Sequence, residues 1–160
     1  MTGNASYVLK DTAVLSVCAV EAPVVVTSQE FDAQLMRTYE RTGMKPGMIE
    51  QLAGVTERRW WPEDVTFVDA AAMAGAKALA EAGVDPSDVG LLINTSVCRT
   101  GIEPANAVGV HDQLGLSTSC LNFDVTNACL GFLNGIQLAG SLIDAGQVDY
   151  ALLVDAEGLR

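Results

Sequence analysis

One of the four cysteines, Cys129, lies where the sequence changes from a strand pattern to a helix pattern. Residues 120–125 form a short segment with the apolar residues Leu121, Phe123 and Val125 and are expected to be a strand, whereas apolar residues recur at helical spacing from Leu130 to Ile143. The amino end of a helix carries unpaired N–H groups and a partial positive charge, which favour a thiolate and stabilise an oxyanion. Because the thiolate is the nucleophilic form of cysteine, this junction predicts covalent catalysis by Cys129.

A second interpretation stays open on these residues alone, because cysteine is also among the most buried residue types and often packs as a small hydrophobe. Gly131 and Gly135 lie in the first turns of the helix, where glycine costs about 1 kcal/mol relative to alanine. We therefore expect something to approach the helix backbone closely there. The helix dipole contributes only about 0.3 to 2 kcal/mol, so a second group that activates the thiol is expected. No base lies beside Cys129 in the sequence.

The surrounding elements predict an α/β fold with a largely parallel sheet and helices on both faces. The unbroken apolar run from Val89 to Thr95 is typical of a strand that is buried on both faces. Further strands are expected at 120–126 and 148–154, and further helices at 64–83 and 104–114. Cys129 and the loop from Ser96 to Glu103 both follow strand carboxyl ends, so they share one edge if their strands are neighbours.

The amino-terminal third is expected to contain a strand from Tyr7 to Val20, a helix from Thr27 or Ser28 to about Arg41, and a loop over residues 42–56. A basic and aromatic cluster follows, and its members Arg58, Arg59 and Trp60 could contact an anionic cofactor with a flat ring. The alternative is that the arginines form surface ion pairs and the tryptophan packs on the core.

Composition limits the classes of partner that the protein can have. The chain has 160 residues, fits one domain and carries a formal net charge of −11, which opposes nucleic acid and anionic membranes as general partners. The four cysteines have no metal-site spacing with the single histidine, His111, so reduced thiols and a cytoplasmic location are expected. Signal-peptide and membrane-span patterns are not found in the sequence.

Five segments carry a resemblance to a known family: G-V-T-E-R-R, D-V-G-L-L-I-N-T-S, E-P-A-N-A, F-D-V-T-N-A-C-L-G-F and D-Y-A-L-L-V-D-A-E. They are similar to the amino-terminal half of the ketoacyl synthase III-like enzymes of the thiolase superfamily. The segments N-T-S-V-C-R-T-G-I-E-P and N-A-C-L-G-F-L-N-G most resemble the branch that joins two fatty acyl-CoA molecules head to head. The resemblance implies a layered αβαβα fold of two similar halves, of which this chain supplies the first, and a dimer.

The resemblance also implies roles for two residues. Cys129 corresponds to the nucleophile that is acylated before a Claisen condensation. Glu103 corresponds to a glutamate that projects into the active site of the partner subunit and acts as the base on the second acyl-CoA. The alternative for Glu103 is a structural one, because a carboxylate just before Pro104 complements the amino end of a helix. Acyl-CoA is then the substrate, and neither a separate cofactor nor a metal is expected.

The sequence departs from the family pattern at two places. Met48 and Leu52 stand where ketoacyl synthase III enzymes have a tryptophan and an arginine that contact CoA. The family's catalytic histidine and asparagine belong to the second half, and His111 is expected to be a structural or surface residue. We therefore expect a second half from elsewhere and a homodimer or a heterodimer with a homologous subunit. There are two alternatives: the chain belongs to a decarboxylative ketoacyl synthase III, which uses a malonyl thioester, or it is a non-catalytic partner subunit.

The helix from Leu130 to Ile143 is expected to be buried between layers, because it is apolar around most of its circumference.

Overall fold

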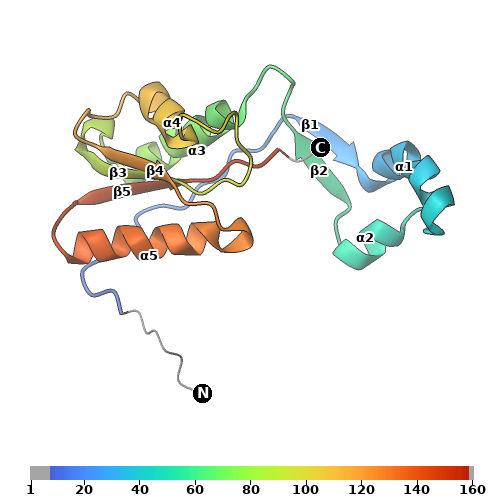
Figure 1. Cartoon of the computed structure of the whole chain (residues 1–160), viewed down its shortest axis with the longest axis horizontal. Coiled ribbons are helices and arrows are strands. Elements are labelled where there is room, and N and C mark those ends of the chain that lie inside the picture. The colour runs from blue at the N-terminus through green and yellow to red at the C-terminus, as the bar shows by residue number, and fades with distance from the viewer. Residues whose placement is uncertain (1–7, 159–160) are drawn as a thin grey trace. The chain divides into compact units, whose positions relative to one another are not determined.

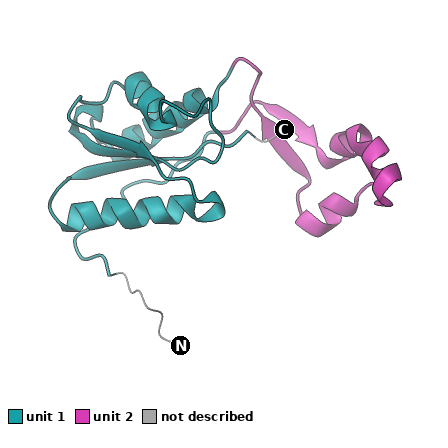
Figure 2. Cartoon of the chain, in the orientation of Figure 1, with its two compact units in different colours: residues 1–20, 65–160 teal, residues 21–64 magenta. Residues whose placement is uncertain are grey.

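The computed structural model describes residues 8–158 and divides the chain into two compact units (Figure 2). Unit 1 comprises residues 1–20 and 65–160, and unit 2 comprises residues 21–64. Both predicted catalytic residues, Cys129 and Glu103, belong to unit 1, whereas the cluster around Arg58 belongs to unit 2. The two units are therefore described separately.

Unit 1 is built on a three-stranded parallel sheet with the strand order β4-β3-β5. The central strand β3 (Val89–Asn94) pairs with β4 (Leu121–Asp124) on one side and with β5 (Tyr150–Val154) on the other. The side chains of Leu91, Leu92 and Ile93 are 0% exposed, which confirms the predicted strand that is buried on both faces.

Helices cover both faces of this sheet, as the sequence predicts (Figure 1). On one face, α3 (Phe67–Ala82) and α4 (Asn106–Leu114) form a core with Leu92. On the other face, α5 (Gly131–Asp144) packs through Ala139 against Leu91 and Ile93. Successive residues of β3 therefore serve opposite cores, because side chains alternate across a strand. A 3₁₀ turn, η1 (Pro86–Asp88), lies between α3 and β3.

The carboxyl end and the small-residue face of α3 agree with the prediction, whereas the helix begins at Phe67 and not at Asp64. Thr66 forms a capping box with Asp69 at the amino end, and Gly83 ends the helix in the left-handed conformation. A Cβ atom added at Gly109 of α4 would lie 2.8 Å from a methyl group of Val68. Because Gly109 has no side chain, α3 and α4 pack closely at this point.

The expectation that α5 is buried between layers is wrong for this chain. Gly131, Gly135 and Ala139 are buried on the side that faces the sheet, whereas Gly140 is buried beside Leu9 of the amino-terminal segment. Leu133 (59%) and Leu138 (42%) lie on other sides of the helix and are exposed, as is Leu130 (55%) in the turn before it. The helix is apolar on most sides, as the sequence indicates, but no second layer covers it among residues 8–158.

The predicted strand from Tyr7 to Val20 is also wrong within the described range, which excludes Tyr7. Residues 8–20 form neither strand nor helix, because their polar groups bind helices instead of a neighbouring strand. The N–H groups of Lys10 and Asp11 donate to the Asp144 carboxylate over 2.7 and 3.0 Å, and the Ser16 hydroxyl donates to Ala78 O. A cavity of about 440 Å³ lies between residues 11–18 and β5.

Unit 2 contains a two-stranded antiparallel ladder and two helices. Strand β1 (Val24–Thr27) pairs with β2 (Glu57–Trp60), and α1 (Ser28–Thr42) and α2 (Met48–Ala53) lie between them in sequence. Thr27 caps α1 as predicted, whereas the predicted loop over residues 42–56 contains α2. The ladder was not predicted, because Glu57, Arg58 and Arg59 lack the apolar alternation of a half-buried strand.

Candidate functional site

The two predicted catalytic segments meet at the edge of the sheet where β3 and β4 end. The loop that carries Glu103 follows β3, and residues 125–130 follow β4. Because the two strands are parallel neighbours, their carboxyl ends lie side by side, and Val125 N donates to Asn94 O over 2.9 Å. The prediction that both segments share one edge is confirmed.

Cys129 lies in a 3₁₀ turn, η2 (Ala128–Leu130), which directly precedes α5. The turn uses two amide groups, since Leu130 N donates to Asn127 O and Gly131 N donates to Ala128 O. Ala128 has a φ of 44°, a left-handed conformation that costs a non-glycine residue about 1 to 2 kcal/mol. This sharp turn leaves the side chain of Cys129 exposed at the amino end of the helix.

The close neighbour that Gly131 and Gly135 require is the sheet itself. A Cβ atom at Gly131 would lie 2.9 Å from Thr95 O and 3.1 Å from Val125 O. A Cβ atom at Gly135 would lie 2.9 Å from Leu153 Cδ2 and 3.0 Å from Thr95 Cγ2. The two glycines therefore bring the start of α5, and with it the turn of Cys129, against the strand ends.

Two of the other cysteines, Cys120 and Cys98, have environments that do not favour a nucleophile. Cys120 is buried, and burial raises the pKa of its thiol. Burial also raises the pKa of the Cys98 thiol, and a hydrogen bond to Glu157 acts in the same direction. Cys18 is half-buried beside the cavity next to β5. Cys129 is the one exposed cysteine, and its thiol has no hydrogen-bond partner within residues 8–158.

Glu103 is exposed, and the helix that follows it is capped by a different carboxylate. Helix α4 begins at Asn106, and the N–H groups of Asn106 and Ala107 donate to Asp124 over 3.0 and 2.9 Å. Asp124 thus satisfies the first amides of the helix, as an anion at a helix amino end does. The carboxylate that caps α4 by hydrogen bonds is therefore Asp124 and not Glu103. The Glu103 carboxylate makes no hydrogen bond or ion pair with the part of the chain that the structure describes.

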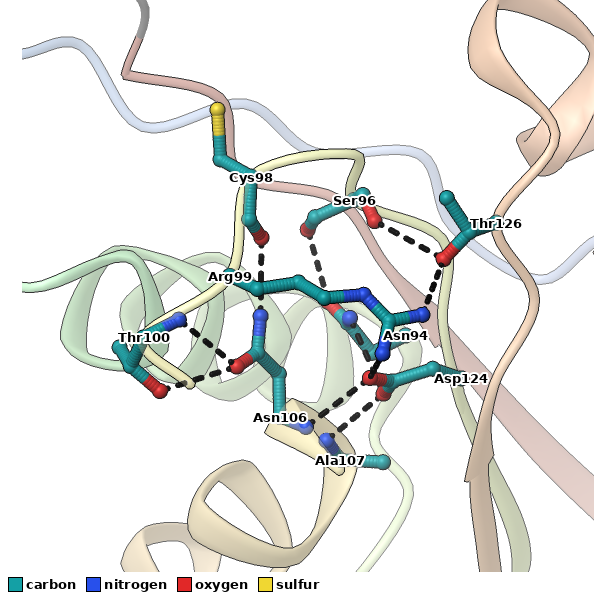
Figure 3. A network of polar contacts seen from close by, with 9 residues as sticks. All are labelled: Asn94, Ser96, Cys98, Arg99, Thr100, Asn106, Ala107, Asp124 and Thr126. Atoms are coloured by element: carbon teal, nitrogen blue, oxygen red, sulfur yellow. Dashed lines mark hydrogen bonds and ion pairs between the residues drawn. The ribbon is translucent and has the colours of Figure 1, made fainter. Parts of the chain in front are cut away.

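Asp124 is the centre of a polar network at the strand ends (Figure 3). Its side chain is 5% exposed and also accepts a hydrogen bond from Asn94 Nδ2 over 3.2 Å. Asn106 extends the network into the loop, because its side chain accepts from Thr100 and donates to Cys98 O. The sequence analysis missed these residues, although polar side chains at the ends of neighbouring buried strands could have indicated them.

The contacts of Arg58, Arg59 and Trp60 are made within unit 2. Arg59 forms ion pairs with Glu21 and Glu57, as the structural alternative expects. The Arg58 guanidinium lies 4.8 Å from the centroid of the Phe31 ring, against which Trp60 packs edge-on. One nitrogen of Arg58, Nη1, is buried without a partner in the described chain. Contact of these three residues with a cofactor stays a prediction.

Three further positions named in the sequence analysis are His111, Met48 and Leu52. His111 Nε2 lies 2.9 Å from Ser117 O in a hydrogen bond that closes the end of α4, which fits a structural role. Met48 and Leu52 are exposed side chains of α2.

Within residues 8–158, no group of histidine, cysteine and carboxylate side chains could hold a metal ion. The same residues include no helix that is long and apolar enough to cross a membrane.

Comparison with known proteins agrees with this architecture. A family model described as 3-oxoacyl-[acyl-carrier-protein] synthase III matches residues 123–159. The acyl-CoA:acyl-CoA alkyltransferase of Xanthomonas campestris is 42% identical over 92% of this chain and 44% of its own length. The β-ketoacyl-[acyl-carrier-protein] synthase III of Rhizorhabdus wittichii is 34% identical over 81% of this chain and 39% of its own length.

A solved structure gives the same result for the fold. A cysteine-to-serine variant of Xanthomonas campestris OleA, with bound lauric acid and lauroyl-CoA, superposes with a TM-score of 0.88 at 40% identity. The match covers 94% of this chain and 45% of that chain. The chain thus spans less than half the length of the curated relatives that it matches, and the match confirms a thiolase-like α/β fold.

Proposed function

Since the chain belongs to the ketoacyl synthase III-like enzymes of the thiolase superfamily and matches their amino-terminal half, we propose that it joins two fatty acyl-CoA molecules. In this proposal Cys129 is the nucleophile and Glu103 is the base. The remaining half of the fold comes from elsewhere, and a homologous or identical subunit completes a dimer.

The reaction has two stages that use different residues of this edge of the sheet. The Cys129 thiol gives up its proton, and the thiolate attacks the thioester carbonyl of the first acyl-CoA. The acyl–sulfur bond to CoA then breaks, and the leaving CoA thiolate takes up a proton, so that the acyl group is now on Cys129. Glu103, which projects across the dimer interface, then removes an α-proton from the second acyl-CoA in the partner subunit's active site, and the resulting carbanion attacks the carbonyl of the cysteine thioester held there. Collapse of that adduct releases the cysteine and forms a β-ketoacyl-CoA.

The observation that carries the proposal is the state of Glu103. A decarboxylative enzyme needs no carboxylate base, because loss of CO₂ generates its carbanion. Glu103 is exposed and unpaired within residues 8–158, while Asp124 performs the capping role that would have explained Glu103 structurally. The Glu103 carboxylate therefore remains available to contact a bound substrate.

The relatives support the same assignment. The Xanthomonas campestris relative is named an acyl-CoA:acyl-CoA alkyltransferase, which is the reaction class proposed here. Solved variants of OleA from that organism include a cysteine-to-serine and a glutamate-to-aspartate substitution. The cysteine and the glutamate that were substituted in OleA are separated by the same number of residues as Cys129 and Glu103 in this chain.

A decarboxylative ketoacyl synthase III is the second candidate, and a specific observation favours it. The matching family model is described as a 3-oxoacyl-[acyl-carrier-protein] synthase III, and the Rhizorhabdus wittichii relative is named a β-ketoacyl-[acyl-carrier-protein] synthase III. In this case a malonyl thioester is the second substrate, and Glu103 has no part in forming the carbanion.

The first experiment tests Cys129. The native assembly, meaning the chain purified with any polypeptide that accompanies it in its host, is incubated with a long-chain acyl-CoA, and the adduct is located by peptide mass spectrometry. The proposal expects the acyl group on Cys129 and its loss in Cys129→Ala. An adduct on Cys98 or Cys120 would refute the assignment, and a complete lack of acylation would favour a non-catalytic subunit.

The second experiment tests Glu103 with an isosteric change. Glu103→Gln should still form the Cys129 thioester but should lose condensation by roughly 100-fold or more, the usual scale for a positioned general base. Glu81→Gln, a change of an exposed glutamate on α3, is the matched control and should condense normally. Normal condensation by Glu103→Gln would instead favour the malonyl thioester.

A further inference from the structure

We propose that Asn127 and Asn134 are positioning residues that hold the turn of Cys129 in the conformation that presents its thiol for acylation. Asn127 Nδ2 donates to Asn134 Oδ1 over 2.7 Å. The inference rests on the proposed function, because it concerns the acylation of Cys129. It does not depend on how the second substrate is activated, since both candidate reactions begin with this acylation. It also needs no residue of a partner subunit.

The two asparagines lie on either side of Cys129 along the chain. Asn127 directly precedes the turn η2, two residues before Cys129. Asn134 lies in the first turn of α5, five residues after Cys129. Their hydrogen bond therefore bridges the turn, from the segment that follows β4 to the helix.

The segment that carries the turn is fixed to the sheet at both ends. At one end, Val125 N donates to Asn94 O over 2.9 Å. At the other end, Gly131 lies against Thr95 O and Val125 O with no room for a side chain. Residues 126–130 between these points are all exposed, so packing within the described chain does not determine their conformation. The turn therefore depends on its own hydrogen bonds.

The turn contains a residue that needs such support. Ala128 has a φ of 44°, and a non-glycine residue stays in this region only where its surroundings hold it there. The backbone contributes a hydrogen bond from Leu130 N to Asn127 O over 2.9 Å. Within residues 8–158, the bond to Asn134 is the one side-chain hydrogen bond made to residues 127–130. It constrains Asn127, the residue directly before the strained Ala128.

The location of the pair separates its effect on rate from its effect on stability. Asn127 is exposed and Asn134 is half-buried, so water can replace a lost partner and the fold should stay intact. The rate of acylation should respond more strongly, because a misplacement of a reacting group by about 1 Å can cost about 100-fold. A variant without this hydrogen bond should therefore be folded but slow.

The kinetic test uses Asn134→Leu, which keeps the size of the side chain and removes its hydrogen-bonding groups. In the native assembly, the maximum rate of Cys129 acylation by a long-chain acyl-CoA should fall by about 10- to 100-fold. The acyl-CoA concentration that gives half of this rate should stay within about twofold, because the pair does not bind the substrate. The final amount of acylated protein should be unchanged, whereas loss of folded protein would lower it.

Gln147→Leu is the matched control, because it changes an exposed amide beyond the other end of α5. It should alter neither the rate nor the amount of acylation. An unchanged maximum rate in Asn134→Leu would overturn the inference. A higher half-saturating concentration would also overturn it, because Asn134 would then contact the substrate instead of positioning the turn.

A double-mutant cycle tests whether the two asparagines act as a pair. Asn127→Leu should reproduce the loss seen in Asn134→Leu. The double variant should be no more than about twofold slower than Asn134→Leu, because the effects of residues in contact are not additive. Multiplication of the two losses would overturn the pairing.

Amide hydrogen exchange gives a readout that does not depend on activity. Both variants should speed exchange at Leu130 and Gly131, whose N–H groups donate within the turn, without changing exchange in β3. Unchanged exchange at these two amides would overturn the inference.

The failure of the inference and the failure of the proposed function give different results. If the unmodified protein is acylated on Cys129 and Asn134→Leu is acylated equally fast, the inference fails and the proposed function stands. If the unmodified protein is not acylated on Cys129, the proposed function fails. Exchange at Leu130 and Gly131 then still decides whether the pair holds the turn.

Discussion

Gly131→Ala should push the turn of Cys129 away from the sheet. The added Cβ would lie 2.9 Å from Thr95 O and 3.1 Å from Val125 O, and real Cβ atoms hardly ever approach within 3.0 Å. Both neighbours are backbone oxygens at strand ends, so neither can rotate out of the way. The start of α5 has to move instead.

The size of the effect follows from two opposing contributions. Overpacking of this kind costs about 1 to 3 kcal/mol, and alanine in a helix returns up to about 1 kcal/mol relative to glycine. The second contribution is smaller than usual because Gly131 is the first residue of α5. We therefore expect a net loss of about 1 to 2 kcal/mol, together with slower acylation of Cys129.

The assay is denaturant unfolding of the native assembly, followed by circular dichroism, with the acylation rate measured in parallel. Gly101→Ala is the control, because its Cβ would meet only Glu103 O at an ordinary 3.7 Å. It should leave unfolding unchanged or slightly favour the folded state. Equal stability and equal acylation in Gly131→Ala would refute the claim that this glycine sets the position of the turn.

Three further changes test other parts of the account. Ala128→Val should lower stability by more than about 1 kcal/mol in the same unfolding assay, because a β-branched residue tolerates the left-handed conformation poorly; equal stability would contradict that strain. Burial opposes ionisation of Glu157, but hydrogen bonds from Cys98 and from the N–H groups of Val97 and Cys98 outweigh it and lower the Glu157 pKa below its ordinary 4.5. The stabilisation by these bonds is present above pH 4.5 and is lost as pH falls through the lowered pKa, so protection factors of the Val97 and Cys98 amides should fall there, and Glu157→Gln should remove this dependence. The 160-residue chain alone should associate through the exposed side of α5, and Leu133→Glu should reduce its mass in light scattering; an unchanged mass distribution would show that this face is not responsible.

The sequence predicts most of the framework around the site because its signals are local and strong. The apolar run at Leu91, Leu92 and Ile93 identifies the central strand, and the glycine stops at Gly83 and Gly115 mark the ends of α3 and α4. Because β3 and β4 are parallel neighbours, the loop of Glu103 and the turn of Cys129, which follow them, lie at the same edge of the sheet. Each of these steps needs only the period of the apolar residues and the residues that end helices.

The errors arise where distant partners decide the structure. Residues 8–20 have a strand composition, but their polar groups bind Asp144 and Ala78. Ladder β1-β2 joins segments about thirty residues apart, and β2 lacks apolar alternation. Capping of α4 by Asp124 likewise depends on a strand that follows the helix in sequence. The left-handed Ala128 has no sequence signal, since glycine or asparagine usually marks that conformation.

The most direct test of the account is a single-turnover measurement on the Cys129 thioester. The native assembly is first acylated, freed of excess substrate, and then mixed with either an unmodified acyl-CoA or a malonyl thioester. The account predicts that the unmodified acyl-CoA alone consumes the thioester and yields a β-keto product without release of CO₂. Consumption only with the malonyl thioester, accompanied by CO₂, would contradict the proposed role of Glu103 as the base.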